Sequence, residues 1–288
     1  MVRRRGWGVA LVAVLGSALG GLAPEVGAQS REAQSREALL LPVPQRPSAL
    51  GGRFGTASPG VSASSPLAFG PGYRDAFFGV GVQATTRYGG GVDGAASGGF
   101  GVGNAQRLVA LEVVLTSLST VRSGLFDRTA AALKVHRRLP WNAAVAVGVE
   151  GIKVTGTNFE TTESVYAAVS KVAVLRGSGD PRQPFSSATV NVGVGNGRFC
   201  AEQAIRTGGT TTYGLADCVA NVFASVGLRA SDWAGLVADW TGQDLNLGVS
   251  LAPFPALPLV VTPALADLTG RAGDGARFTV GAGFGLRF

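Results

Sequence analysis

The residues best placed to do chemistry are two cysteines, Cys200 and Cys218, and the chain has no others. They bracket the segment 201–217. Two cysteines at the feet of one loop form a disulfide in an oxidising compartment. Closing a loop of this length stabilises the fold by about 3 kcal/mol in the chain-entropy model. We therefore expect a Cys200–Cys218 disulfide, and two unpaired thiols on neighbouring strand ends are the alternative.

The single histidine, His136, is the candidate general base. A hydrolase would need a serine and an orienting polar group beside it, but its neighbours on the same strand face are cationic (Arg128, Lys134 and Arg138). We therefore expect a structural or electrostatic role and no catalytic residues.

No cofactor is expected from the remaining chemical signals. One histidine and two distant cysteines lack the spacing of a zinc site. The glycine strings 99–103 and 193–197 lack the strand–helix setting and the lysine of a phosphate-binding loop. The sequence therefore predicts neither a metal nor another cofactor.

In the segments that carry these residues, apolar residues alternate with small or polar ones, with a period of two. In the last segment, Phe278, Val280, Ala282, Phe284, Leu286 and Phe288 share one face, while Arg, Thr and Gly occupy the other. A strand with one wholly apolar face and one small or polar face is typical of a membrane β-barrel. We therefore predict an all-β, transmembrane, antiparallel up-and-down barrel.

About twelve strands can be traced, with ten or fourteen as alternatives. The expected ranges are 76–87, 94–103, 107–119, 125–139, 143–154, 163–176, 186–197, 218–230, 232–241, 243–252, 257–268 and 276–288. With both termini in the periplasm, the connections 87–93, 119–124, 155–162, 198–217, the turn around Gly242 and 270–275 would face outward. A secreted soluble β-sandwich, with its apolar faces packed together, is the competing fold.

The N-terminus predicts export. Arg3, Arg4 and Arg5 precede an apolar stretch from Trp7 to Leu22, and small residues follow at 26–28, so residues 1–28 are expected to be a signal peptide. Its removal lowers the formal net charge from +7 to +5, and we expect no nucleic-acid partner. Residues 29–75 are expected to be an extended or disordered Pro-rich leader, in which Leu39–Leu41 could dock inside a lumen. The barrel is expected over 76–288.

The strand facings assign charged residues to the lumen. The basic candidates are Arg87, Arg128, Lys134, His136, Arg138, Arg229, Arg277 and Arg287, and the acidic candidates are Glu112, Glu150, Asp239 and Asp244. Opposed charges would pair and plug a narrow barrel, whereas an unpaired cationic stripe would give a pore an anion preference.

The C-terminal strand resembles the signature that the outer-membrane barrel assembly machinery recognises, in Phe284, Leu286 and the terminal Phe288. The run 239–248, together with 261–264 and 273–278, is similar to a family of uncharacterised outer-membrane barrels of diderm, cyanobacterial-type bacteria. The resemblance implies an outer-membrane location, contact with lipid and help from the assembly machinery. It supplies no catalytic residues.

Three functions remain open at this point. The first is a narrow porin-like channel for small solutes, with anions preferred. The second is a structural or adhesive barrel with a plugged lumen and a disulfide-closed surface loop. The third, an enzyme, would need a surface serine beside His136. The sequence does not define an oligomeric state.

Overall fold

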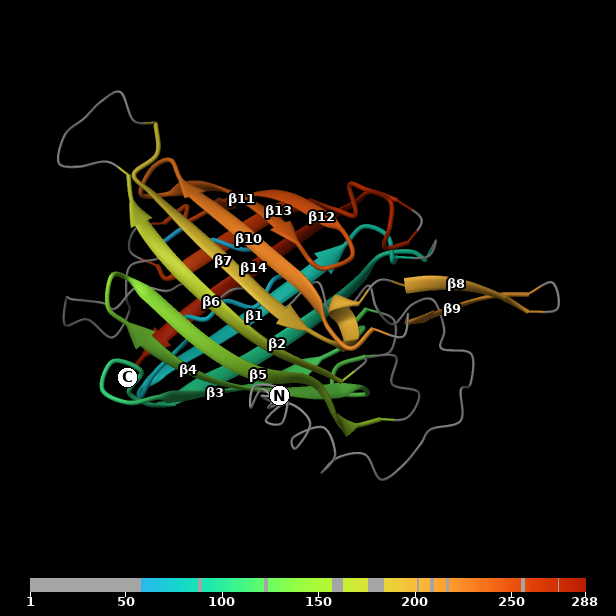
Figure 1. The fold of residues 1–288 in the computed structure, drawn as a ribbon, viewed down its shortest axis with the longest axis horizontal. Helices are drawn as coiled ribbons and strands as arrows, with labels where there is room; N and C mark the ends of the chain where they lie inside the picture. Colours follow the sequence, from blue (N-terminus) through green and yellow to red (C-terminus); the bar gives the residue numbers. More distant parts are fainter. Residues whose placement is uncertain are drawn as a thin grey trace, which may run out of the picture.

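The computed structural model describes residues 58–87, 90–121, 124–156, 163–175, 184–200, 202–207, 210–215, 218–254, 257–273 and 275–288. Within these residues, twelve antiparallel strands pair side by side and close into a barrel (Figure 1). The predicted fold class is confirmed, and all twelve expected strands are present.

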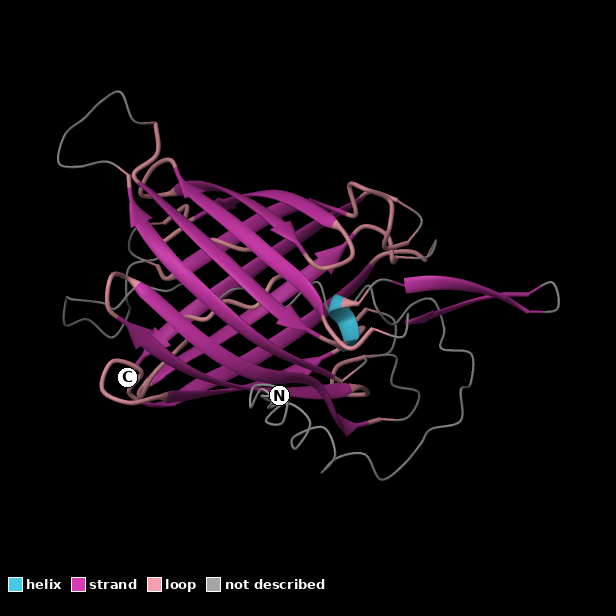
Figure 2. Ribbon diagram, in the orientation of Figure 1, coloured by secondary structure: helices cyan, strands magenta, loops and turns pink. Residues whose placement is uncertain are grey.

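Strands make up almost all of the regular structure (Figure 2). The barrel strands are β1 (Asp75–Gln83), β2 (Asp93–Gly103), β3 (Ala110–Ser117), β4 (Thr129–Leu139), β5 (Ala143–Thr155), β6 (Ser164–Val174), β7 (Ser187–Gly195), β10 (Asn221–Arg229), β11 (Ala234–Trp240), β12 (Leu245–Leu251), β13 (Leu259–Ala266) and β14 (Arg277–Arg287). A short 3-10 helix, η2 (Gly197–Phe199), follows β7. In the described ranges, no helix is long and apolar enough to cross a membrane.

The ring closes between the first and last strands. Val80 of β1 pairs with Ala282 of β14, and Gly81 pairs with Gly281. Closure removes the free sheet edges and lets the backbone groups of every strand pair on both sides. A strand arrangement of this kind can therefore lie in lipid without exposing unpaired N–H and C=O groups.

Outward-facing side chains are apolar, and inward-facing ones are small or polar. In β7, Val190, Val192 and Val194 are exposed, whereas Thr189 and Asn191 are buried. The same exposed apolar rows occur on other strands, with Phe78, Val80 and Val82 on β1, Phe100 and Val102 on β2, Val165 and Val169 on β6, and Leu247 and Val249 on β12. A soluble sandwich would bury these faces, so that alternative does not describe the fold. An apolar exterior around a polar interior is typical of a lipid-embedded barrel.

The two ends of the barrel differ. One end carries the C-terminus and the turns 104–109, 140–142 and 230–233, and we call it the C-terminal end. The other carries η2 and a two-stranded sheet of β8 (Glu202–Thr207) and β9 (Thr210–Leu215), and we call it the hairpin end. The β8–β9 hairpin projects beyond the barrel (Figure 1). It lies within the connection 198–217, which the sequence predicts to be a loop without strands.

Candidate functional site

Residues 58–74, which we call the lumen segment, lie inside the barrel except for Tyr73 and Arg74, which are exposed at its C-terminal end. Near the C-terminal end, the Gly60 N–H donates to Ser250 Oγ at 2.6 Å. The segment then turns at residues 62–65, toward the hairpin end, and returns until the Tyr73 N–H donates to Gly103 O at 2.8 Å. It therefore enters and leaves through the same end of the barrel.

The position of the lumen segment differs from the sequence expectation. Residues 58–74 were expected to belong to an extended or disordered leader, whereas Ser62, Leu67, Ala68 and Phe69 are buried. The segment is extended, but the barrel wall supplies hydrogen-bond partners along its length, so it is held in place. Residues 29–57, including Leu39–Leu41, lie outside the described residues.

Asp239 of β11 holds the turn of the lumen segment. Its carboxylate accepts hydrogen bonds from Ser62 Oγ at 2.5 Å, from the Ala63 N–H at 2.6 Å and from the Ser65 N–H at 3.4 Å. Asp239 is almost fully buried. Hydrogen bonds to a charged acceptor are stronger than neutral ones, so this carboxylate is the main polar anchor on the β10–β12 side of the barrel.

The returning arm is bonded to the opposite wall. The Ala68 N–H donates to Ser170 Oγ at 2.8 Å, and Asn191 Nδ2 donates to Pro66 O at 3.1 Å. Ser170 also donates to Asn191 Oδ1 at 2.7 Å. Polar residues of β6 and β7 that face inward therefore satisfy the backbone of the segment.

Lys134 and His136 of β4 also contact the backbone of the lumen segment. Lys134 Nζ donates to Phe69 O at 3.0 Å, and His136 Nε2 lies 3.0 Å from Pro71 O. His136 is buried inside the barrel, whereas the enzyme hypothesis needed it beside a serine on the outer surface. Its observed role is to contact the lumen segment.

Two wall glycines make room for the segment. A Cβ at Gly227 of β10 would lie 2.6 Å from Val61 Cα, and one at Gly101 of β2 would lie 2.5 Å from Pro71 O. Both distances are too short for a side chain. The wall is therefore shaped to fit the segment as well as bonded to it.

The 3-10 helix η2 lies at the hairpin end and contacts both the wall and the lumen segment. Arg198 forms an ion pair with Glu150 of β5, and its NH2 group donates to Ser64 O at 3.3 Å. Phe199 stacks on Phe223 with ring centroids 4.4 Å apart, and Tyr166 meets both rings edge-on. The lumen segment and η2 therefore meet at this end of the barrel.

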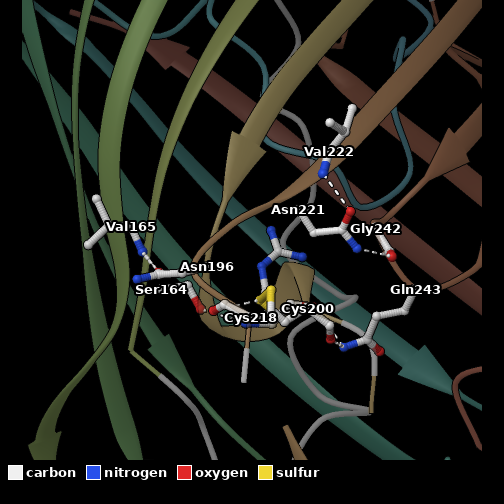
Figure 3. The surroundings of a disulfide bond; sticks show 10 residues. Ser164, Val165, Asn196, Cys200, Cys218, Asn221, Val222, Gly242 and Gln243 are labelled. Atoms are coloured by element: carbon white, nitrogen blue, oxygen red, sulfur yellow. Dashed lines mark hydrogen bonds between the residues drawn. A yellow bond between two sulfur atoms is a disulfide. The ribbon is translucent and has the colours of Figure 1, made fainter. Parts of the chain in front are cut away.

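The predicted Cys200–Cys218 disulfide is present, with a Cα–Cα distance of 5.9 Å. Gln243 Nε2 donates to the carbonyl oxygens of Arg198 and Cys200, and Asn221 Nδ2 donates to Gly242 O at 2.7 Å (Figure 3). The disulfide and these bonds attach the base of the β8–β9 hairpin to the barrel rim.

The residues that the sequence assigned to the lumen differ in how far they are buried. Buried among them are Arg87, His136, Arg277, Glu112, Glu150, Asp239 and Asp244; Lys134 is partly buried, and Arg128, Arg138, Arg229 and Arg287 are more accessible. Lys134 lies 2.6 Å from Glu112, and Arg277 lies 3.4 Å from Asp267. Ion pairs therefore neutralise much of the buried charge.

Asp244 lies in the β11–β12 turn at the hairpin end. Burial raises the pKa of its carboxyl above the usual range, and Thr269 opposes this shift by donating its hydroxyl and N–H to Oδ1 at 2.5 and 3.1 Å. This carboxylate ties the β11–β12 turn to the β13–β14 loop.

The residues assigned to barrel assembly lie at the C-terminal end. Leu286 and Phe288 are exposed and Phe284 is partly buried. The Phe288 N–H donates to Arg74 O at 3.0 Å. Their recognition by the assembly machinery stays a prediction.

A cavity of about 830 Å³ opens at the C-terminal end, between the two arms of the lumen segment and the wall. Its lining includes Arg138, Val172, Thr189 and Arg229 from four strands, and Phe69 from the lumen segment. Sequence reasoning placed the two arginines but not the cavity, because the segment that forms one side of it was assigned to a leader.

The comparisons with known proteins identify no family. No family model matches the chain, and no curated protein matches it. Among solved structures, the crystal structure of the Acinetobacter baumannii outer membrane protein Omp33 is similar, with 12% sequence identity and a TM-score of 0.38 over 76% of this chain and 100% of that one. At this level of similarity, a functional assignment depends on the geometry of the chain itself.

Proposed function

We propose that this protein is a non-enzymatic outer-membrane β-barrel that is closed at rest by its own residues 58–74 and presents the β8–β9 hairpin on the outer side of the membrane. The observation that carries the proposal is the lumen segment, which is hydrogen-bonded to both walls, from Asp239 on one side and from Ser170, Asn191 and Lys134 on the other. A lumen filled in this way favours the plugged, structural or adhesive barrel over an open pore.

The outer-membrane location is supported by the apolar exterior. Side chains such as Phe78, Val192 and Leu247 are about half exposed on strands that run the height of the barrel, and in water such a surface would be a strong aggregation hazard. The signal peptide at 1–28 and the assembly signal at the C-terminus fit the same location, as does the proposed relationship to cyanobacterial-type outer-membrane barrels.

The orientation is supported by the connections. Outer-membrane barrels have short periplasmic turns and longer outer loops. The turn 140–142 at the C-terminal end joins its strands directly, whereas β7 and β10 are joined through η2, the disulfide and the hairpin. The hairpin end is therefore assigned to the cell surface and the C-terminal end to the periplasm.

An epitope tag tests this assignment. We expect a tag inserted between Thr207 and Thr210 to bind antibody on intact diderm cells, and a tag in the 140–142 turn to bind only after the outer membrane is permeabilised. Both tagged proteins should fractionate with the outer membrane. Labelling of the 140–142 tag alone on intact cells would reverse the orientation, and recovery of both proteins in the soluble fraction would refute the membrane location.

A narrow channel for small solutes is the second candidate, and the cavity at the C-terminal end favours it. Arg138 and Arg229 line that cavity, so solutes entering from this end would meet positive charge. Conduction would require the lumen segment to move, because its turn and η2 close the other end. Both ends of the segment lie at the same end of the barrel, which allows withdrawal without threading.

A further inference from the structure

The cavity at the C-terminal end has the composition of an anion-binding site. Three arginines line it (Arg137, Arg138 and Arg229), and among the residues that the structure describes, none that line it is acidic. Its volume of about 830 Å³ falls within the range of about 300–1,000 Å³ that holds small-molecule ligands. The cavity is thus large enough for a ligand and carries one sign of charge.

Arg138 is the residue that most clearly lacks a counter-charge. Among the described residues its guanidinium has no hydrogen-bond or ion-pair partner, although it is only partly exposed. Arg137, the third arginine of the lining, is exposed, whereas Lys134 pairs with Glu112 at 2.6 Å and Arg229 pairs with Asp232 at 2.7 Å. A planar guanidinium binds carboxylate and phosphate groups through two parallel hydrogen bonds, so Arg138 is suited to an oxyanion.

The groups that face Arg138 do not neutralise it. His136 and Lys134 lie on the same face of β4, and Glu112 of β3 is engaged by Lys134. Asp232, at the rim, is engaged by Arg229 and is almost fully exposed. Among the described residues, the charge around Arg138 is therefore positive, and their part of the cavity lining holds no carboxylate that would compete with an anion.

The rest of the cavity is partly apolar. Val61 and Phe69 of the lumen segment contribute to one side, and Val172 of β6 contributes to the wall. Ser187 and Thr189 of β7 add hydroxyl groups. A ligand with a charged head and an apolar body would match this lining better than an inorganic anion would.

We propose that this cavity binds a small organic anion, in which a carboxylate or phosphate group contacts Arg138 and an apolar body lies against Phe69 and Val172. The supply of such a ligand from the periplasm rests on the proposed function, but binding by the purified protein does not. The site is also independent of whether the β8–β9 hairpin is at the cell surface.

Isothermal titration calorimetry on the purified full-length mature protein in lipid nanodiscs tests the site. The probes are 2-naphthoate, its neutral analogue 2-naphthylmethanol, and inorganic phosphate, which lacks the apolar body; empty nanodiscs correct for partitioning into lipid. We expect saturable binding of 2-naphthoate, with at least about tenfold weaker binding of the other two, since a charge-assisted hydrogen bond is worth at least this factor. Tight phosphate binding would overturn the apolar part of the proposal.

Arg138→Gln is the diagnostic variant, and Arg107→Gln is its control, since Arg107 is an exposed arginine at the same end that does not line the cavity. We expect Arg138→Gln to weaken 2-naphthoate binding at least about tenfold and Arg107→Gln to leave it unchanged. Equal affinity in wild type and Arg138→Gln would overturn the proposal. Should Arg138→Gln fail to fold, the wild-type comparison of naphthoate with naphthylmethanol still decides, because equal affinities would exclude recognition of the charge.

Discussion

At the residue scale, the position of the lumen segment depends strongly on one buried carboxylate. Asp239 accepts three hydrogen bonds from residues 62–65, which form the turn of the segment farthest from its entry. These residues have few apolar contacts to replace a lost anchor, because three of the four are serines. Removal of Asp239 should therefore release the turn before it affects the barrel.

Asp239→Ala should make the turn accessible to solvent. With Ser64→Cys as a reporter, we expect maleimide labelling to become at least about tenfold faster, since each hydrogen bond to a charged group contributes about 1.5–3 kcal/mol. Labelling rates in detergent measure this. Asp127→Ala, at an exposed position in the β3–β4 connection, is the control, and equal rates in the two variants would show that Asp239 does not hold the turn.

Asp244 predicts a dependence of stability on pH. Because burial raises its pKa in the folded state, the folded protein retains this proton above the pH at which the unfolded chain loses it. The contribution of Asp244 to the free energy of unfolding should therefore be complete below about pH 4 and fall as the pH rises through the folded pKa. Guanidinium unfolding between pH 3.5 and 7 should show a smaller decline in Asp244→Asn than in wild type. An identical decline would refute this role.

At the element scale, alternation predicted the strands well because each one faces two different environments. The pattern in 276–288 placed β14 at Arg277–Arg287, and the disulfide followed from the positions of Cys200 and Cys218. The β8–β9 hairpin was missed because it lies beyond the barrel, so it is not subject to the alternation between lipid and lumen that revealed the other strands.

The lumen segment could not be found from sequence for a different reason. Its composition of Ser, Pro, Gly and Ala is that of a linker, and its order comes from partners far away in the chain, such as Asp239 and Asn191. The role of Gly227 could not be predicted either. Its close approach to Val61 is visible only in the folded structure, and in the sequence it does not differ from other strand glycines.

Gly227→Ala should displace the lumen segment. The added methyl group would overlap Val61, whereas a Cβ at Gly285 of β14 would meet no atom within 4 Å. We expect the Ser64→Cys reporter to label faster in Gly227→Ala than in Gly285→Ala, with both barrels folded. The same slow labelling in both variants would mean that the fit between wall and segment is looser than the structure indicates.

Loss of the disulfide should weaken the hairpin end. We expect the double variant Cys200→Ser, Cys218→Ser to lose about 3 kcal/mol of unfolding free energy, on the chain-entropy account of an 18-residue separation. Guanidinium unfolding in detergent gives the value, and wild type treated with a reductant should match the variant. An unchanged unfolding free energy would show that Gln243 and Asn221 hold the base of the hairpin without the covalent bond.

At the scale of the whole molecule, the barrel combines an apolar exterior with an interior filled by its own chain. The segment and η2 meet at the hairpin end, and a cavity lined by three arginines lies at the C-terminal end. On the proposed function, small anions would enter the cavity from the C-terminal end but would not pass through the barrel. The central claim is therefore that the resting lumen does not conduct.

Single-channel recording in planar bilayers tests that claim most directly. The full-length mature protein, shown to be folded, should give no steady conductance in a salt gradient, whereas a variant lacking residues 58–72 should conduct steadily with a preference for anions. Steady conductance of the same size from both proteins would contradict the account, since it would show that the lumen segment does not close the barrel.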